Sequence, residues 1–360
     1  MIEKDITNIR LLKQQISYTK FKKVKDIVNF IGAIQAQDYA MAKWGIGIRL
    51  PGSTDKIVTS AINNGEIIRT HLLRPTWHFV SADDIYWMLQ LTAPQIKSSM
   101  KSRNKELGLT EGVFNKSNRA IIRALSGRKN LTREELKKEL EKAKINTDNN
   151  RLSHLLMEAE LDGIICSGKV MGKKQTYAML SERAPNKKVL TKEEALAELA
   201  NRYFSSHGPA TLKDFVWWSS LPVKDAKSAL ELIKSNFIPE TFNLETYWMT
   251  NSSSVSCTAQ SSIHLLPAYD EFIISYKSRA IAFASEHLKK AVSSNGIFRP
   301  VVLINGKVGG LWRRTINKNK VIIEMELFQQ PSKKTLSLIK KKGILFGDFL
   351  GMKTELFFSN

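Results

Sequence analysis

The stretch that decides the fold is residues 131–180, LTREELKKELEKAKINTDNNRLSHLLMEAELDGIICSGKVMGKKQTYAML. Thr132 and Glu135 have the spacing of a capping box, which predicts that a helix begins directly after Thr132. Apolar residues then recur at helical spacing over 151–161, and Gly163 follows where that helix should end. The stretch therefore predicts two successive helices joined by a polar turn.

A helix before these two and a hairpin after them complete the pattern. Residues 118–125 have the periodicity of a helix, while 164–166 and 176–180 are typical of strands. The tip between the two strands is rich in glycine and lysine. This order predicts a winged helix-turn-helix, in which the second helix can enter a major groove and the basic wing can reach a phosphate backbone.

The same pattern recurs on both sides of this stretch. Thr211–Phe215 repeats the capped helix start, with a long helix expected over 192–204 before it and a wing expected over 237–249. A more diverged copy fits the first hundred residues, with helices near 24–36 and 56–63 and strands within 66–80. Three copies indicate a repeated architecture. The alternative is that helix, helix and hairpin follow one another by chance in many α+β proteins.

The last third of the chain is richer in predicted strands, which fall at 264–267, 300–304, 308–312 and 321–328. Asn305 and Gly306 separate two of them and predict a tight hairpin turn, because both residues tolerate positive φ. Ser332 is expected to cap a helix that runs through Lys342 and ends at Gly343. We interpret this region as a β-rich scaffold for the three repeats.

Together these segments predict an α+β fold with three tandem winged helix-turn-helix units and a C-terminal β-rich scaffold. A serine-rich stretch, with serines at 252–254, 256 and 261–262, is the expected boundary of the scaffold. We therefore expect units at 1–112, 113–185 and 186–255, and a scaffold unit with a terminal helix at 256–360.

The charge of the chain predicts a polyanionic partner. It has 55 Lys and Arg against 34 Asp and Glu in 360 residues, a formal net charge of +21. A folded chain with this excess favours nucleic acid ahead of a membrane surface. The alternative is a general excess of lysine in a composition rich in Lys, Asn and Ile. The hydrophobic fraction of 42% is that of a globular protein and argues against wholesale disorder.

The cysteines and the N-terminus indicate the compartment. Cys166 and Cys257 are too far apart to form a metal-binding motif or a disulfide framework. The charged N-terminus lacks the apolar core of a signal peptide, and no apolar run approaches a membrane span. We expect a reduced, cytoplasmic protein without membrane attachment, metal or cofactor.

The usual catalytic signatures are missing from the sequence, but one short motif is still a candidate catalytic site. The sequence has no GxxxxGK[ST], GxSxG or HExxH. Gln35 and Gln37, however, stand one apolar residue apart at the end of an apolar helix. Such residues share a side in extended backbone but lie about 200° apart on a helix. They face one pocket only if the helix ends or distorts there, and the alternative is a polar helix terminus.

Four blocks of the chain resemble, in order, the signature blocks of the winged-helix DNA glycosylases typified by AlkZ and YcaQ. These blocks are 32–50 (GAIQAQDYAMAKWGIGIRL), 69–80 (RTHLLRPTWHFV), 265–279 (LLPAYDEFIISYKSR) and 296–313 (GIFRPVVLINGKVGGLWR). The resemblance implies three winged helices on a barrel-like unit, which agrees with the repeats. It also implies that Gln35 and Gln37 form the Gln-aliphatic-Gln motif that carries catalysis in the AlkZ branch, where alkylated bases are excised.

The resemblance and the chemistry of amides together predict a monofunctional glycosylase for cationic alkylated purines. We expect Gln37 to be the main water-positioning residue and Gln35 its partner at the sugar. Asp38 is the competing charge stabiliser, and the favoured alternative is that it caps a helix or pairs with Lys43 or Arg49. The expected partner is double-stranded DNA that carries alkylated bases, including bulky adducts or interstrand crosslinks, and the protein is expected to act as a monomer.

The expected DNA contacts are donors on the predicted hairpins. They are Arg69, His71, Arg74, Trp77 and His78 on the first hairpin, Lys169, Lys173 and Lys174 on the second wing, and Arg313 and Arg314 after the last hairpin. Core packing is an alternative for Trp77 and His78. The competing functions are a non-catalytic transcriptional regulator, which would read base edges, and a structural chromatin protein.

Overall fold

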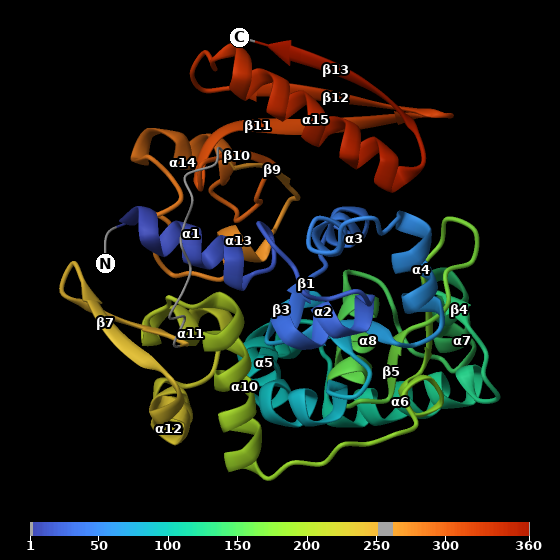
Figure 1. Cartoon of the computed structure of the whole chain (residues 1–360). Coiled ribbons are helices and arrows are strands. Elements are labelled where there is room, and N and C mark those ends of the chain that lie inside the picture. Colours follow the sequence, from blue (N-terminus) through green and yellow to red (C-terminus); the bar gives the residue numbers. More distant parts are fainter. Residues whose placement is uncertain (1–2, 251–261, 360) are drawn as a thin grey trace.

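The computed structural model describes residues 3–250 and 262–359, and Figure 1 shows how they are arranged. The chain is a mixed α+β protein, as predicted. Three helical units with small sheets lie below a C-terminal unit built around a larger sheet (Figure 1). The N-terminal helix α1 (Glu3–Lys13) packs against the C-terminal unit through Leu11. Most of the serine-rich stretch, which was the expected last boundary, lies outside the described residues.

The second unit has the predicted order of elements. They are α6 (Glu111–Leu125), β4 (Leu131–Thr132), α7 (Arg133–Lys142), α8 (Arg151–Leu161), β5 (Ile165–Ser167), β6 (Thr176–Met179) and the short helix α9 (Leu180–Arg183). Thr132 caps α7 and Glu135 bonds back to Thr132, so the capping box is present. The three strands form one sheet in the order β4-β6-β5. The expected boundary at residue 112 falls in the first turn of α6.

The third unit repeats this order with one strand reduced to a bridge. Its elements are α10 (Lys192–His207), α11 (Leu212–Ser219), α12 (Val223–Ile233), the 3₁₀ turn η1 (Lys234–Asn236), β7 (Ile238–Phe242) and β8 (Glu245–Met249). Thr211 and Asp214 form the capping box of α11. Ala210, directly before this cap, pairs with Trp248 of the wing, as Leu131 pairs with Tyr177 in the second unit. The repeat therefore includes the strand position before the cap.

The first unit follows the same order but differs from the expectation in two places. Its elements are α2 (Val24–Ile31), β1 (Ala33–Gln35), α3 (Tyr39–Gly47), α4 (Asp55–Asn63), β2 (Ile67–Leu72) and β3 (Arg74–Ser81). The helix expected over 24–36 ends at Ile31, because Gly32 takes a φ of +90° and the chain turns into β1. Helix α3 was not expected, since two glycines lower the helix propensity of its second half.

The C-terminal unit contains β9 (Ile263–Leu266), α13 (Glu271–Ile274), α14 (Ser285–Ala291), β10 (Val301–Ile304), β11 (Lys307–Asn317), β12 (Lys320–Leu327), α15 (Lys333–Leu350) and β13 (Lys353–Ser359). Asn305 and Gly306 form the predicted turn, with φ of 51° and 79°. The sheet order is β13-β12-β11-β10-β9, so β9 and β13 are edges and the described strands do not close into the barrel that the resemblance implied. Strand β13 was not predicted.

Helix α15 is longer than the sequence predicted. We expected it to end at Gly343, but it continues to Leu350 and ends at Gly351, which has a φ of +67°. Gly343 serves packing instead, because a Cβ there would lie 2.6 Å from a Leu356 side-chain carbon on β13. The helix can therefore lie directly on the sheet.

Two hydrophobic cores meet at the first unit. One core joins α2, α3 and α4 to the C-terminal sheet and α15, and the other joins β2 and β3 to α10, α11, α12 and the long helix α5 (Ile85–Glu106). Successive residues of β1 enter different cores: Ala33 packs in the core with α5 and α10, and Ile34 packs in the core with the C-terminal sheet. The first unit is thus held between the third unit and the scaffold, and the strand that carries Gln35 lies at this junction (Figure 1).

Candidate active site

The two glutamines lie at the corner between β1 and α3. The helix before them has ended at Ile31, and β1 pairs with β3 so that Gln35 is opposite His78. The N–H of Ala36 donates to the carbonyl of Trp77 at 2.7 Å, which keeps the backbone extended one residue further. The condition set by the sequence, that the helix must end before the two glutamines, is met.

The side chain of Gln35 is buried and held. It is 7% exposed, and its Oε1 accepts a hydrogen bond from Arg74 Nη2 at 3.1 Å. Its backbone N–H donates to Glu271 Oε1 at 2.7 Å, from α13 of the C-terminal unit. Gln35 is therefore fixed at both its backbone and its carboxamide.

Gln37 differs from Gln35 in both respects. Its side chain is exposed, and no hydrogen bond connects it to another residue within the described part of the chain. Asp38 follows it and caps α3, since its carboxylate accepts from the Met41 N–H at 3.1 Å. Gln37 is free to meet a ligand at the surface, whereas Asp38 serves the helix.

The two cations that the sequence offers to Asp38 pair with other carboxylates. Lys43 pairs with Asp55 at 2.6 Å, and Arg49 is bound by both oxygens of Asp270. Asp38 instead lies 3.7 Å from the guanidinium of Arg314. The last hairpin therefore reaches the corner that carries the glutamines.

Glu271 is a buried anion directly behind this corner. Its carboxylate contacts the Trp218 indole N–H at 3.2 Å and the Ser275 hydroxyl, and it lies 3.8 Å from His207 Nε2. Burial by itself would raise the pKa of Glu271, but the neighbouring His207 imidazole, followed by the charge of Arg74, lowers it to about 2. Glu271 is therefore ionised at neutral pH, although it is 1% exposed.

The sequence did not single out Glu271, although it lies in one of the resembling blocks. A signal was present: Asp270 and Glu271 directly precede the apolar run Phe272–Ile274. Acidic residues at the start of a segment that must be buried need partners. Asp270 finds Arg49 and caps α13, while Glu271 reaches β1.

Three of the expected DNA contacts lie inside the protein and are bound there. Arg69 is 8% exposed, and its Nε donates to the carbonyl of Ala36 at 3.0 Å. His71 Nδ1 contacts the buried carboxylate of Glu160 on α8. His78 is fully buried, and burial followed by the charge of Arg74 lowers its pKa to about 3. These side chains hold the first hairpin in place through contacts inside the protein.

The remaining candidates on the first hairpin are partly buried. Trp77 lies against two buried groups, with the Arg69 guanidinium 4.2 Å and the His71 ring 4.5 Å from its centroid. This supports the core-packing alternative for Trp77. Arg74 is also partly buried, and its contact with Gln35 occupies one of its donors.

The second wing does offer free cations. Lys169, Lys173 and Lys174, here called the wing lysines, are all exposed. Arg313 is exposed but pairs with Glu324, with contacts of 2.9 and 2.6 Å. Helix α8, which the sequence offered to a major groove, has no exposed residue, because it packs between α5 and the first hairpin. The wing, rather than the second helix, is the accessible part of this unit.

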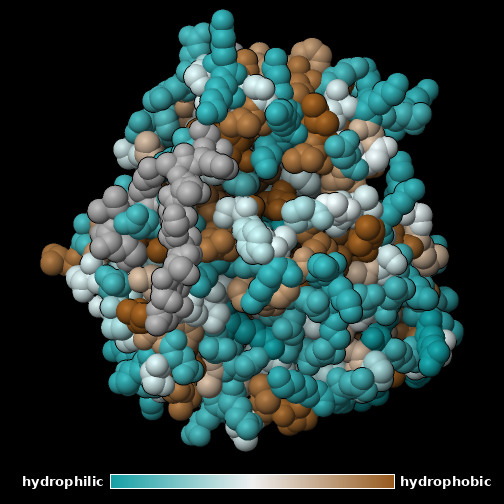
Figure 2. All heavy atoms as spheres, in the orientation of Figure 1, coloured by the Kyte–Doolittle hydropathy of each residue, from teal (hydrophilic) through white to brown (hydrophobic). Residues whose placement is uncertain are grey.

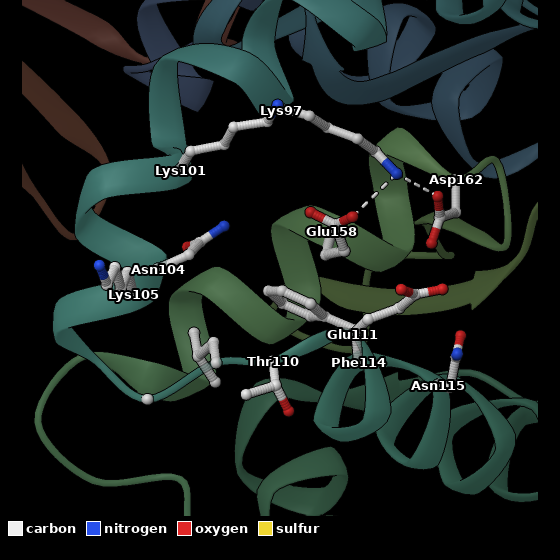
Figure 3. A pocket seen from close by; sticks show the side chains of 12 residues that line it. Lys97, Lys101, Asn104, Lys105, Thr110, Glu111, Phe114, Asn115, Glu158 and Asp162 are labelled. Atoms are coloured by element: carbon white, nitrogen blue, oxygen red, sulfur yellow. Dashed lines mark hydrogen bonds and ion pairs between the residues drawn. The ribbon is translucent and has the colours of Figure 1, made fainter.

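Cavities on the surface lie mostly away from the glutamines. A cavity of about 340 Å³ borders the first hairpin and is lined by Arg69, Trp77 and Tyr177 among others. A larger one of about 580 Å³ lies between α5, α6 and α8, where Lys97 bridges Glu158 and Asp162 (Figure 3). Hydrophilic side chains cover most of the face in Figure 2, and its brown patches gather mainly over the C-terminal unit. Neither of these two cavities is lined by Gln35 or Gln37, and Gln37 is exposed at the corner.

Neither a metal nor a membrane span is indicated by the residues described. Over 3–250 and 262–359, no three His, Cys, Asp or Glu side chains are grouped so that they could hold a metal ion. The helices within the same ranges are too short or too polar to cross a bilayer.

Comparison with known proteins identifies the family of the chain. The family model described as "DNA glycosylase AlkZ-like" matches residues 28–349. The chain belongs to this family. A relative from Streptomyces sahachiroi, named "Interstrand DNA cross-link repair glycosylase", is 22% identical over 340 residues, covering 89% of this chain and 88% of the relative. The solved structure of S. sahachiroi DNA glycosylase AlkZ superposes with a TM-score of 0.79 at 18% identity and 98% coverage of both chains, which shows a shared fold.

In this AlkZ-like chain the corner combines one held carboxamide with one free carboxamide. Neither group is a strong acid or base, so neither can protonate a leaving base or fully deprotonate water. Both can orient a water molecule or a sugar oxygen by hydrogen bonds. Arg314, 3.7 Å from Asp38, and the exposed wing lysines stay predicted phosphate contacts. Such an arrangement suits hydrolysis of a bond that is already activated by the substrate.

Proposed function

We propose that this AlkZ-like protein hydrolyses the N-glycosidic bond of cationic alkylated purines in double-stranded DNA and leaves an abasic site. The observation that carries the proposal is that the exposed carboxamide of Gln37 follows the fixed carboxamide of Gln35 by two residues at the end of β1. Gln37 positions the attacking water, and Gln35 acts beside it at the sugar. The family membership supports a hydrolase that acts on DNA.

The substrate supplies the activation that the protein lacks. A purine alkylated at N7 or N3 carries a positive charge, so the C1′–N bond can break with its electron pair leaving on a neutral base. Water then bonds to C1′ and releases its proton to solvent. A fixed amide dipole can orient this water and oppose the positive charge that develops on the sugar. An uncharged normal base would need a strong acid, so the same site leaves normal DNA intact.

The lysine closest in sequence to the motif supports a monofunctional reaction. Lys43 lies on α3 but is 8% exposed, and its Nζ is bound to Asp55 at 2.6 Å and to Thr59 at 3.1 Å. An ammonium held in this way is a poor nucleophile for C1′. We therefore expect no strand cleavage by β-elimination and no protein–DNA adduct that borohydride can trap.

Crosslinked and bulky substrates are part of the proposal. The named relative is an interstrand crosslink repair glycosylase, and a surface corner has room for an adduct that a closed pocket would exclude. The test is an excision panel of duplexes carrying 7-methylguanine, 3-methyladenine or an N7-linked interstrand crosslink. We expect release of the alkylated base from at least one of them, with an intact abasic strand.

The same panel distinguishes the competing functions. A transcriptional regulator would release no base and would bind one sequence tightly, and a chromatin protein would show neither release nor sequence preference. The enclosed position of α8 gives no support to base reading by the second unit. Absence of release from every alkylated duplex would overturn the proposed function.

A further inference from the structure

We propose that Glu271 and Arg74 are positioning residues that fix Gln35 for excision, Glu271 through the backbone and Arg74 through the carboxamide. This inference rests on the proposed function of the corner. The two residues come from different parts of the fold, Arg74 from β3 and Glu271 from α13. The C-terminal scaffold would thereby take part in setting the geometry of a site on the first winged helix.

Glu271 supplies a partner that β1 lacks on its outer side. β1 is an edge strand, since the sheet order is β1-β3-β2. The N–H of Ala36 points to β3, so the N–H of the preceding residue, Gln35, points away from the sheet. The carboxylate of Glu271 accepts this N–H at 2.7 Å. A charge-assisted hydrogen bond thus takes the place of the missing neighbouring strand and fixes the position of β1 relative to α13.

The carboxylate is itself fixed by residues of the third unit and of its own helix. Trp218 on α11 donates to Oε2 at 3.2 Å, and Ser275 donates to the same oxygen. Because Oε2 is bound by these donors, Oε1 remains for the N–H of Gln35. The position of β1 is therefore set relative to both the third unit and the scaffold.

Arg74 decides which end of the Gln35 carboxamide faces outward. A guanidinium only donates hydrogen bonds, so the atom that faces Arg74 must be the amide oxygen. With Oε1 bound at 3.1 Å, the amide nitrogen is directed elsewhere and offers two hydrogens. Gln35 then donates to an oxygen of the DNA backbone or of the deoxyribose. Gln37, which has no partner in the described chain, can accept a hydrogen from water.

The two positioning residues also balance each other's charge. The Arg74 cation beside the corner would by itself oppose the positive charge of an alkylated base and of the sugar. Glu271 and Arg74 both contact Gln35 and carry opposite charges, so the charge of Glu271 offsets part of the charge of Arg74. Loss of Glu271 alone would leave an uncompensated cation beside the reacting sugar, whereas loss of both would not.

The experiment measures single-turnover excision by Glu271→Gln, Arg74→Met and the double variant, on a duplex from which the wild-type protein releases base. Asp84→Asn is the matched control, because Asp84 is an equally buried carboxylate that binds Arg202 and has no contact with Gln35. Affinity for a duplex containing a non-cleavable abasic analogue and the melting temperature are measured for each variant.

We expect Glu271→Gln to lower the excision rate about 10- to 100-fold, in line with the loss of a hydrogen bond to a charged group, with unchanged duplex affinity. Arg74→Met should lower it by a similar factor, Arg74→Lys should recover part of the rate, and the double variant should lose less than the product of the single losses. Asp84→Asn should lose stability but excise normally at a temperature well below its melting point.

Each outcome decides the proposal. Wild-type rates in Glu271→Gln and Arg74→Met, or losses no larger than in Asp84→Asn, would overturn the positioning roles while leaving the glycosylase assignment intact. Should Glu271→Gln fail to fold, Arg74→Met and its lysine counterpart test the orientation of Gln35 by themselves. If the wild-type protein releases no base from any alkylated duplex, the proposed function fails and the positioning roles fail with it.

Discussion

Replacing Gln37 with alanine should separate catalysis from folding. The side chain of Gln37 is exposed and makes no hydrogen bond to the described protein, so its removal should change the free energy of unfolding by less than about 0.5 kcal/mol. If it positions the attacking water, the rate of base release should fall about 10²- to 10³-fold, the usual result of removing one preorganised polar group from an active site. A large kinetic effect without a thermodynamic one would identify a functional side chain.

Gln35→Ala should behave differently because Gln35 is held by Arg74. Its removal leaves the guanidinium without the amide oxygen at 3.1 Å, and an unsatisfied, partly buried donor costs about 1–3 kcal/mol. The variant should therefore lose both stability and excision. Urea unfolding and single-turnover release of 7-methylguanine, measured on the same preparations, give the two quantities.

Asp38→Asn is the control for this comparison. Asparagine caps helices about as well as aspartate, so α3 should be preserved, while the negative charge at the corner is lost. We expect near-normal excision. If Asp38→Asn abolishes excision and Gln37→Ala does not, the carboxylate is the working group and the amide mechanism is refuted.

Three further outcomes follow from the structure. Asp270→Asn leaves the fully buried Arg49 without its counter-charge, so the free energy of unfolding in urea should fall by about 3–5 kcal/mol; a loss below about 1 kcal/mol would contradict a working buried ion pair. Burial, followed by the charges of Lys342 and Arg49, lowers the pKa of His264 to about 3. At a pH below about 6.5, the pKa of histidine in the unfolded chain, the unfolded state therefore binds a proton at His264 that the folded state does not bind. Stability should fall by about 2 kcal/mol from this residue between pH 6.5 and 5, and His264→Leu should remove that part of the pH dependence. Changing the wing lysines to alanine should reduce the slope of log binding constant against log salt by about 0.9 for each lysine that contacts a phosphate, and an unchanged slope would place the DNA elsewhere.

The repeats could be predicted from the sequence because their signals are local. The capping boxes at Thr132 and Thr211 and the turn at Asn305 each depend on residues within a few positions of one another, and the structure confirms all three. The Gln-x-Gln motif was also visible, since it needs only three residues. What the sequence could not show was whether the helix ended before Gln35, because Gly32 is compatible with a helix end as well as a helix interior.

The errors arose where distant segments decide the local structure. Gly343 was taken as a helix end, but it is needed for contact with Leu356, a residue that follows the helix. Arg69 and His71 are predicted DNA contacts because they are donors on a hairpin, but the structure buries both. Their partners, Ala36 and Glu160, lie on other elements that only the tertiary fold brings together. Glu271 was missed for the same reason, since its link to Gln35 joins residues far apart in sequence.

A comparison of the three repeats supports placing the proposed chemistry in the first of them. In each repeat a short strand or bridge leads into a capped helix, and the residue directly before the cap is Gln37, Leu131 or Ala210. Leu131 and Ala210 pair with their wings, so their positions serve the sheet. In the first repeat the strand ends at Gln35, which releases Gln37 from the sheet and exposes its side chain. β1 is an edge strand, and Glu271 binds its free edge from the scaffold. The exposed amide and the buried carboxylate thus lie at the end and at the free edge of the same strand.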